Sequence, residues 1–272
     1  MTFADPIALG RSGLQVGRLG LASSYGAPAA AFEEAFERGC NYFVWGSFIR
    51  GRRPAMRDAV QAIVRRGQRE RMVLAMHSYW HSALLMPGSV QRALKALHTD
   101  HLDVLILGYY PRRPSRAVLQ AALKLRQAGL IRCIGLSGHN RGLFPELASE
   151  TNSPIDVFHV RYNAAHRGAE QEIVAPLQGL ESRPGFVAFT ATRWGRLLDP
   201  GRMPPGESAP SAVDCYRFVL SRPGVDVCLT GPRSLEQMRQ NLRLLDQGPM
   251  DEAELARMRR IGDHVYGRKG AE

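Results

Sequence analysis

The stretch LDVLILGYYPRRPSRAVLQAALKLRQAGLIRCIGLS, residues 102–137, decides the fold class, because it predicts a strand, a helix and a second strand in succession. Residues 102–108 and 131–136 are nearly continuous apolar runs, which is typical of strands buried on both faces. Between them, residues 115–128 have the apolar spacing of an amphipathic helix, and Gly129 is suited to end it. Two strands joined by a helix lie parallel in one sheet, so this stretch predicts an α/β protein.

The same alternation of strand and helix continues through the rest of the chain. Eight such units within 272 residues fit a closed (β/α)8 barrel, the TIM barrel, better than an open sheet. The expected strands lie near 18–22, 41–45, 71–77, 102–108, 131–136, 156–160, 185–190 and 225–229. The expected barrel helices lie near 28–38, 54–66, 88–97, 115–128, 141–149, 168–180, 211–221 and 234–245.

Three further segments complete the predicted organisation. Residues 7–23, IALGRSGLQVGRLGLAS, predict an N-terminal β-hairpin that leads into the first barrel strand. The Pro- and Gly-rich residues 199–210 are a candidate mobile cover, and a final helix near 250–262 is expected to pack on the outside. No internal repeat or second composition is present, so residues 1–272 are expected to form a single barrel domain.

The composition narrows the class of protein and its compartment. No apolar run approaches the roughly 20 residues that a membrane-spanning helix needs. The first residues lack a basic start followed by an apolar stretch, so we expect no secretory signal and a cytoplasmic location. Cys40, Cys133, Cys215 and Cys228 are scattered without a metal-ligand spacing, so we expect buried free thiols and no metal site.

The net charge of +11 comes almost entirely from arginine. These arginines are spread along the predicted helices and are not interleaved with aromatic residues on one element, so the pattern does not favour nucleic-acid binding. A local role for some arginines in holding an anionic cofactor is the better interpretation.

In a barrel of this type the functional side chains lie at the C-terminal ends of the strands. At these positions the chain has many aromatic, histidine and amide side chains but no carboxylate. The residues are Trp45, Ser47, His77, Tyr79, Gly108, Tyr109, Tyr110, Ser137, His139, Asn140, His159, Tyr162, Asn163, Phe189, Thr190, Arg193 and 230–234. We expect a small-molecule ligand in this mouth.

Three of these side chains are candidates for proton transfer. His77 could act as a general acid or base, because histidine titrates near neutral pH, or it could be a neutral histidine held by hydrogen bonds. Tyr109 and Tyr110 could supply a phenol proton, or they could shape the rim of the pocket.

Six segments, in chain order and each at the corresponding strand, together resemble the aldo-keto reductase family. They are LGRSGLQVGRLGL (9–21), AFERGCNYF (35–43), LHTDHLDVLIL (97–107), LRQAGLIRCIGLSGHN (125–140), RYNAAHRGAE (161–170) and TGPRSLEQMRQNL (230–242). The resemblance implies an NADP(H)-linked barrel whose catalytic site contains Asp, Tyr, Lys and His. In that family the tyrosine donates a proton to the carbonyl oxygen, the lysine and aspartate lower its pKa, and the histidine orients the substrate.

The four catalytic positions implied by this resemblance are all substituted in this chain. The aspartate position is Val44, the tyrosine position is Ile49, the lysine position is His77 and the histidine position is Gly108. Proton transfer by a positioned group is typically worth about 10²–10⁴-fold in rate, and the tyrosine that supplies it is absent here. The sequence therefore predicts a divergent member for which ordinary carbonyl reduction is not expected.

The cofactor side matches the family better. At the nicotinamide end Ser137 and Phe189 match the family, and Thr190 matches loosely. The family's glutamine position is His159, and its asparagine position is Gly138, for which Asn140 could substitute. At the adenosine end the matching residues are Arg233, Ser234, Gln237 and Asn241. Backbone N–H groups at a helix start, together with an arginine, suit a 2′-phosphate, so NADP(H) is the expected cofactor. These residues could instead have local structural roles, with Ser234 as a helix N-cap and Asn241 as a helix-to-loop hydrogen bond.

Three functions remain open at this point. The first is an aldo-keto-reductase-like redox protein that binds NADP(H) and uses a rearranged acid, with His77 or a nearby tyrosine in that role. The second is a non-redox enzyme of the isomerase or lyase type, with His77 as its base. The third is a non-catalytic protein that senses a ligand or cofactor.

Overall fold

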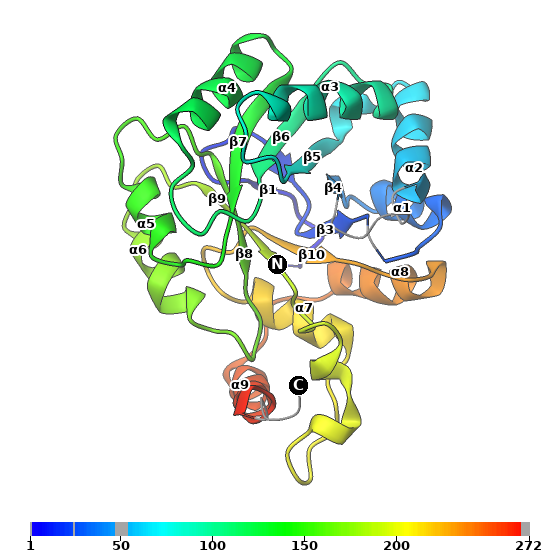
Figure 1. The fold of residues 1–272 in the computed structure, drawn as a ribbon. Coiled ribbons are helices and arrows are strands. Elements are labelled where there is room, and N and C mark those ends of the chain that lie inside the picture. Colours follow the sequence, from blue (N-terminus) through cyan, green and yellow to red (C-terminus); the bar gives the residue numbers. More distant parts are fainter. Residues whose placement is uncertain (1, 24, 47–53, 268–272) are drawn as a thin grey trace.

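The computed structural model describes residues 2–23, 25–46 and 54–267, in which parallel strands close into a barrel surrounded by helices (Figure 1). The barrel order is β10-β3-β4-β5-β6-β7-β8-β9, which confirms the predicted (β/α)8 fold. The strands are β3 (Leu19–Ala22), β4 (Tyr42–Trp45), β5 (Val73–Ser78), β6 (Leu102–Leu107), β7 (Ile131–Ser137), β8 (Val157–Arg161), β9 (Gly185–Phe189) and β10 (Val227–Thr230).

The helices lie at the predicted places along the chain. They are α1 (Ala29–Glu37), α2 (Pro54–Arg65), α3 (Leu85–Leu97), α4 (Arg116–Gln127), α5 (Leu143–Ala148), α6 (Ala175–Gln178), α7 (Ala212–Leu220), α8 (Leu235–Leu242) and α9 (Glu252–Gly267). The predicted helix 168–180 differs in detail, because Glu170–Val174 form a π-helical turn before α6. None of the described helices combines the length and the apolar character needed to cross a lipid bilayer.

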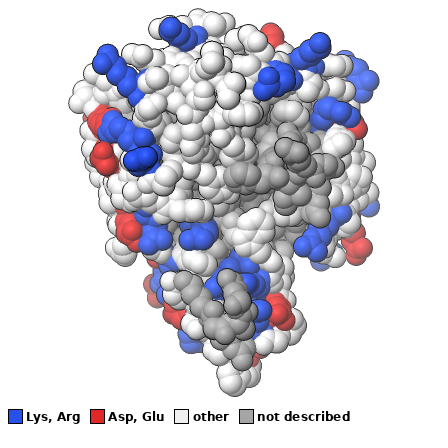
Figure 2. Space-filling view, in the orientation of Figure 1, with Lys and Arg blue, Asp and Glu red and all other residues white. Residues whose placement is uncertain are grey.

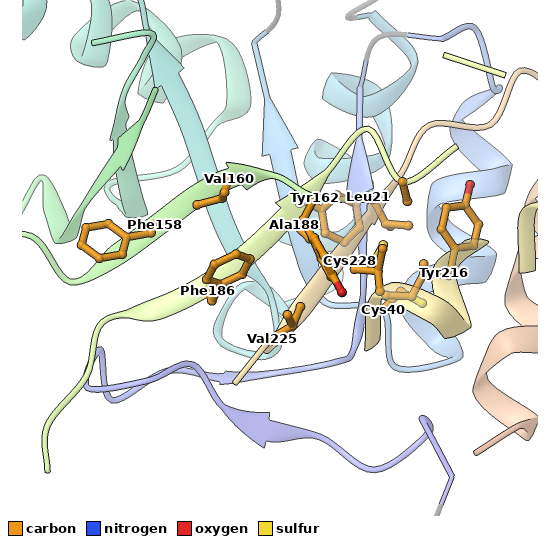
Figure 3. Close-up of a cluster of buried hydrophobic side chains, with 14 of the residues drawn as sticks. Leu21, Cys40, Phe158, Val160, Tyr162, Phe186, Ala188, Tyr216, Val225 and Cys228 are labelled. Atoms are coloured by element: carbon orange, nitrogen blue, oxygen red, sulfur yellow. The ribbon is translucent and has the colours of Figure 1, made fainter. Parts of the chain in front are cut away.

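Side chains of the strands alternate between two apolar layers. Inward-facing residues such as Tyr42, Val104 and Val187 fill the barrel interior. Outward-facing residues, including Phe158 of β8 and Phe186 of β9, pack in a second layer beneath the helices (Figure 3). This alternation decides which side chains reach the mouth of the barrel, because each strand presents every second residue to the interior.

A hairpin of β1 (Ile7–Ala8) and β2 (Gln15–Val16) covers the N-terminal end of the barrel. Its residues Leu9 and Leu14 pack with the inward-facing strand residues. Gly10 has a φ of 49°, and a Cβ there would lie 2.3 Å from the backbone nitrogen of Gly185, so only glycine allows this close approach. The predicted N-terminal hairpin is therefore confirmed, and it seals the end opposite the mouth.

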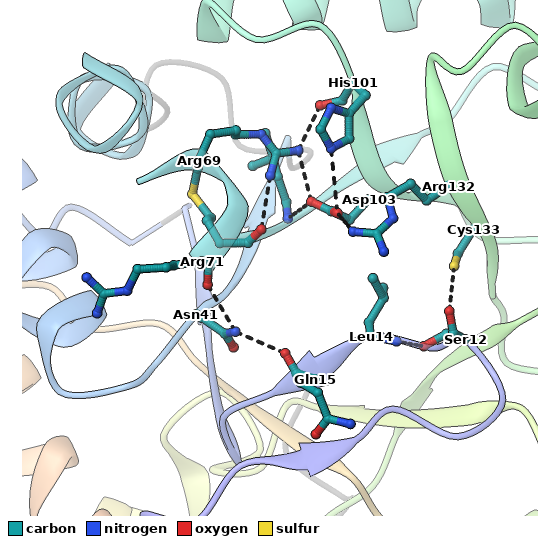
Figure 4. A network of polar contacts seen from close by, with 12 residues as sticks. Ser12, Leu14, Gln15, Asn41, Arg69, Arg71, His101, Asp103, Arg132 and Cys133 are labelled. Atoms are coloured by element: carbon teal, nitrogen blue, oxygen red, sulfur yellow. Dashed lines mark hydrogen bonds and ion pairs between the residues drawn. The ribbon is translucent and has the colours of Figure 1, made fainter. Parts of the chain in front are cut away.

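Three aspartates at strand starts tie neighbouring strands together at this end. Asp103 accepts a hydrogen bond from the backbone N–H of Leu74 at 2.8 Å and pairs with Arg69 and Arg132 (Figure 4). Asp156 likewise accepts a hydrogen bond from the backbone N–H of Ile134 on the neighbouring strand and pairs with Arg126. Asp226 accepts from the backbone N–H of Phe186 and pairs with Arg183. Asp103 and Asp226, which are buried, thus lie at the end of the barrel opposite the mouth, where their contacts stabilise the fold.

The C-terminal helix α9 lies beside the segment that follows β9, at one edge of the molecule (Figure 1). The side chain of Arg193, which is buried, donates a hydrogen bond to the carbonyl oxygen of Val265. Glu207 forms ion pairs with Arg257 and Arg260 of α9. The segment 199–210, predicted as a mobile cover, is therefore anchored to α9 through Glu207, and the residues just before it are anchored through Arg193. These contacts join residues that are too far apart in the sequence to be paired from the sequence alone.

The four cysteines are buried in the structure and have free thiols, as predicted. Burial raises the pKa of the Cys40 thiol to about 12, so the thiol is protonated at neutral pH.

Candidate functional site

A cavity of about 670 Å³ occupies the C-terminal mouth of the barrel. Its wall is formed by strand ends, by the residues that follow β9 and by the turn that leads into α8. No Asp or Glu is among the described residues that line it. Its wall is rich in aromatic rings, which come from Tyr25, His77, Tyr79, Tyr109, Phe189, Trp194 and Tyr216.

The structure brings most of the predicted site residues into this wall and leaves four out of it. The residues that line the cavity are His77, Tyr109, Ser137, Phe189, Thr190, Arg233, Gln237 and Asn241. The residues outside the wall are Tyr110, Asn140, His159 and Ser234. Of the four positions that the resemblance assigns to catalytic residues, Val44 and His77 line the cavity, whereas Ile49 lies outside the described residues.

Gly108 provides the space in which the ring of Tyr79 lies. A Cβ on Gly108 would be 2.8 and 2.9 Å from two ring carbons of Tyr79. The Tyr79 ring is stacked on His77, with centroids 5.5 Å apart, and on Tyr109 at 5.7 Å. The place of a side chain at position 108 is thus taken by a tyrosine from the neighbouring strand end.

His77 follows Ala75 on the inward face of β5, so its ring points into the mouth. Its Nδ1 atom is buried and has no hydrogen-bond partner among the residues that the structure describes. Burial lowers the pKa of His77 to about 4. The ring is therefore neutral at neutral pH and can offer one N–H donor and one nitrogen acceptor to a ligand.

His159 lies inside the barrel beneath the cavity. Its Nε2 atom and the hydroxyl of Tyr42 are 2.8 Å apart, and its ring contacts His77 edge-on with centroids at 5.3 Å. Burial, and then the nearby His77, lower the pKa of His159 well below its usual value. The partner Tyr42 was not expected from the sequence, although it alternates with Val44 on the inward face of β4.

The two candidate tyrosines after β6 point in different directions. Tyr109 has a φ of 55° and lines the cavity, whereas Tyr110 is buried and stacks on His81 with ring centroids 4.0 Å apart. Burial raises the pKa of both phenols. A raised pKa makes each phenol a weaker acid, so neither is activated as a proton donor.

The adenosine-end residues are organised around the start of α8. Ser234 is the N-cap, and its hydroxyl accepts a hydrogen bond from the backbone N–H of Gln237 at 3.1 Å. The side chain of Gln237 accepts a hydrogen bond from the backbone N–H of Arg233 at 2.9 Å. In a capping box this bond would come from the backbone N–H of the N-cap residue, Ser234, so the contact here is shifted by one residue. The Arg233 side chain is exposed and has no hydrogen-bond or ion-pair partner within the described parts of the chain.

Asn241 has a structural contact in addition to its place in the wall. It donates to the hydroxyl of Thr230 at 2.9 Å, and that hydroxyl is also 2.9 Å from the hydroxyl of Tyr216. This buried cluster fixes the end of β10 against α7 and α8. Asn140 is exposed and donates to the carbonyl oxygen of Pro111 at 3.2 Å, away from the cavity wall.

The segment after β9 has an unusual backbone. Thr190, Arg193 and Trp194 have φ values of 62°, 51° and 57°, in the left-handed region that is costly for residues other than glycine. The ring of Trp194 lies 6.3 Å from that of Tyr25, which comes from the loop after β3. The sequence analysis did not identify Trp194, because its contribution to the wall depends on this backbone geometry.

Comparison with known proteins agrees with the fold. The family model described as the aldo/keto reductase family matches residues 7–197. Among solved structures, an aldo-keto reductase from Bacillus halodurans in its holo form is similar with a TM-score of 0.75 and 20% identity, over 94% of this chain and 95% of that chain. Its apo form has a TM-score of 0.76 and 21% identity over the same shares of the two chains. No curated protein sequence matches the chain.

Proposed function

Because this chain belongs to the aldo/keto reductase family, we propose that it binds NADP(H) in the barrel mouth and does not carry out ordinary carbonyl reduction. One observation carries both halves of the proposal. The same cavity is lined by six of the nine expected cofactor-side residues and by Val44 and His77, which occupy two of the positions that the resemblance assigns to catalytic groups.

The residues present fit a dinucleotide. A cavity of about 670 Å³ lies within the usual range for cofactor and small-molecule sites. Arg233 supplies an exposed cation beside the start of α8, where the helix dipole also favours an anion. Two N–H groups of this turn are already used by Ser234 and Gln237, so the Arg233 guanidinium is the main group available for a 2′-phosphate.

When bound, the cofactor supplies hydride-transfer chemistry. Ser137 and Phe189 would orient its nicotinamide end, the former by a hydrogen bond and the latter through its ring face. Val44 cannot tune a proton donor, and His77 is neutral because burial lowers its pKa to about 4. Without a positioned acid, a carbonyl substrate loses the contribution of about 10²–10⁴-fold that such a group provides.

A non-redox proton transfer is a second candidate, because His77 lines the cavity and is unprotonated at neutral pH. With a pKa lowered to about 4, the ring has a free lone pair but is a weaker base than an ordinary histidine. The nearby His159 is neutral for the same reason, so the pair places no charge in the barrel interior.

The binding half is tested by titrating the purified chain with NADPH and with NADH while following protein and cofactor fluorescence. We expect saturable binding with a preference for NADPH. Arg233→Ala should weaken NADPH about tenfold and remove the preference, because it removes a charged hydrogen-bond donor. Arg243→Ala, which removes an exposed arginine that does not line the cavity, is the matched control and should leave both affinities unchanged.

Two results would contradict the proposal. Absence of saturable NADPH binding would remove the cofactor and leave the proton-transfer function as the better candidate. Rapid NADPH consumption with simple aldehydes or ketones would show that an acid is present after all. Exchange of solvent deuterium into a carbonyl ligand, lost in His77→Gln, would support the second candidate.

The proposal also covers the kind of molecule that the protein binds and the cellular compartment in which it is found. On the face shown in Figure 2, Lys and Arg lie in several separate groups, many of them beside Asp or Glu, and do not form one basic patch. We therefore propose a small-molecule ligand and no nucleic-acid partner. The four free thiols support a reducing compartment such as the cytoplasm.

A further inference from the structure

The loop after β5 exposes large apolar side chains to solvent. Trp80 and Leu85 are each 46% exposed, and Leu84, between them in the sequence, is 85% exposed. Among the residues that the structure describes, the other large apolar side chains with comparable exposure are Trp194 and Tyr266, which belong to distant segments of the chain. The exposed apolar side chains are therefore concentrated in this loop, and such a concentration is typical of a contact surface.

The outward faces of α3 and α4 continue this surface. On α3 the exposed residues Leu85, Arg92 and Lys95 are spaced by seven and three, so they share one face of the helix. On α4 the exposed residues Ala117 and Lys124 are spaced by seven and share a face in the same way. The two helices lie side by side at the top of the molecule in Figure 1, so their outward faces form one surface with the loop.

A groove of about 360 Å³ joins the two helices beside the loop. Ala83 and Pro87 line one side of it, and residues of α4, among them Gln120, Ala121 and Lys124, line the other. Most of this lining is apolar. The groove therefore brings apolar side chains of the loop and of both helices next to the charge of a lysine.

No carboxylate of these segments balances their cations. The sequence contains neither Asp nor Glu at residues 71–99 or 104–145, which include the loop, α3 and α4. Arg92, Lys95 and Lys124 have no ion pair or hydrogen bond with any residue in the described ranges. The surface thus carries positive charges that remain available to an external anion.

Carboxylates of the neighbouring elements are already paired. Asp58 of α2 pairs with Arg57 at 2.8 Å, and Glu146 of α5 pairs with Arg113 at 3.2 Å. In Figure 2 the upper part of the molecule, where α3 and α4 lie, is mostly uncharged and is bordered by separate Lys and Arg side chains. An apolar area with unpaired cations at its border complements a partner that is negatively charged at its surface and apolar beneath it.

We propose that the loop after β5 and the outward faces of α3 and α4 bind reversibly to an anionic lipid surface. Leu84 projects from the protein and is outside the groove lining, so it can insert between lipid headgroups. Trp80 suits the same boundary, and Arg92, Lys95 and Lys124 meet the anionic headgroups. The contact is peripheral and requires no segment that spans the bilayer. This inference goes beyond the proposed function and does not depend on a bound cofactor.

Two other occupants fit this surface less well. In a symmetric dimer the same surface of both copies would meet, so the cations Arg92, Lys95 and Lys124 of one copy would face those of the other. An acidic helix of another protein would place its apolar side chains in the groove. Leu84, the most exposed apolar side chain of the loop, lies outside the groove lining and would gain little from that contact.

The test mixes the full chain with vesicles of phosphatidylcholine alone or of equal parts of phosphatidylcholine and phosphatidylglycerol, and measures the bound fraction by co-sedimentation. We expect binding to the anionic vesicles only, weakened by added salt because salt screens exposed charges. Leu84→Gln should lower the affinity about tenfold or more, because it removes an apolar side chain from the lipid. Leu84→Met keeps an apolar side chain and should retain the affinity. Lys124→Gln should lower it about fivefold.

Arg243→Gln is the matched control for charge, because it removes an exposed arginine that follows α8 and lies outside this surface. It should leave vesicle affinity unchanged. Equal binding to both kinds of vesicle, or equal losses in Lys124→Gln and Arg243→Gln, would overturn the proposal. So would dimerisation that Leu84→Gln abolishes, or binding of an acidic amphipathic peptide without binding of anionic vesicles. NADPH affinity should be unchanged in Leu84→Gln, so this proposal and the proposed function fail independently.

Discussion

At the residue scale, the smallest side chain in the mouth controls the arrangement of its largest neighbours. Gly108 lies at the position that the resemblance assigns to a catalytic histidine, and the space beside it holds the Tyr79 ring. A side chain at position 108 would overlap this ring, so the stack of His77, Tyr79 and Tyr109 depends on the glycine. A larger residue at position 108 and this aromatic stack therefore exclude one another.

Gly108→Ala tests this dependence. The added methyl group would overlap the Tyr79 ring, so we expect a loss of about 1–3 kcal/mol in the free energy of unfolding, measured by urea denaturation. The same substitution in a Tyr79→Ala background should cost clearly less, because the ring that it displaces is gone. Equal costs in the two backgrounds would show that the ring of Tyr79 does not depend on Gly108.

At the element scale, α9 does more than cover the outside of the barrel. It holds the segment after β9, whose backbone has three left-handed residues other than glycine, through Arg193 and through the ion pairs of Glu207. Residues held in left-handed conformations cost free energy and persist only where surrounding contacts fix them. The helix therefore maintains the wall of the cavity that contains Thr190 and Trp194.

Arg193→Met should release this wall. Removing a buried, charged hydrogen-bond donor should lower the free energy of unfolding by about 1.5–3 kcal/mol and increase hydrogen exchange in residues 190–198. Arg202→Met is the control in the same segment, since Arg202 forms only an exposed ion pair with Asp199. That change should alter stability by less than about 1 kcal/mol. Similar exchange rates in both variants would mean that the Arg193 contact does not hold the segment.

At the scale of the whole molecule, two neutral histidines inside the barrel couple its stability to pH. Burial lowers the pKa of His77 in the folded chain to about 4, against 6.5 for the ordinary side chain. Burial, and then the nearby His77, also lower the pKa of His159 well below its usual value. The unfolded chain therefore binds more protons than the folded chain between these values. Stability should be constant with respect to these groups above pH 6.5 and should fall as the pH falls through 6.5 toward 4.

His77→Gln should make this decline less steep. Protonation of His77 accounts for a loss of up to about 3 kcal/mol in the free energy of unfolding once the pH is below the folded pKa, and the variant lacks this titrating group. The measurement is the urea midpoint as a function of pH for the wild-type chain and the variant. His98→Asn is the control, since it removes an exposed histidine and retains a residue that tolerates the left-handed backbone at this helix end. An unchanged acid slope in His77→Gln would contradict the burial of this ring in its neutral form.

The sequence by itself determined the order of strands and helices and the hairpin, and it also gave the expectation that the catalytic positions are substituted. These features depend on local patterns: apolar runs such as 102–108, periodic helices such as 115–128, and the residue at each strand end. The inward or outward direction of a side chain such as His77 also follows from alternation once the strand is known. Such information is carried by residues close together in the chain.

Only the tertiary structure decided which of these side chains meet. The contact of Tyr42 with His159, the ring of Tyr79 above Gly108 and the anchoring of Arg193 on α9 each join residues that are remote in sequence or whose contact depends on backbone geometry. The closure of the barrel places β4 opposite β8, and α9 lies beside the segment after β9. The chemistry of the mouth therefore depends on distances in space, which a linear pattern of residue types does not specify.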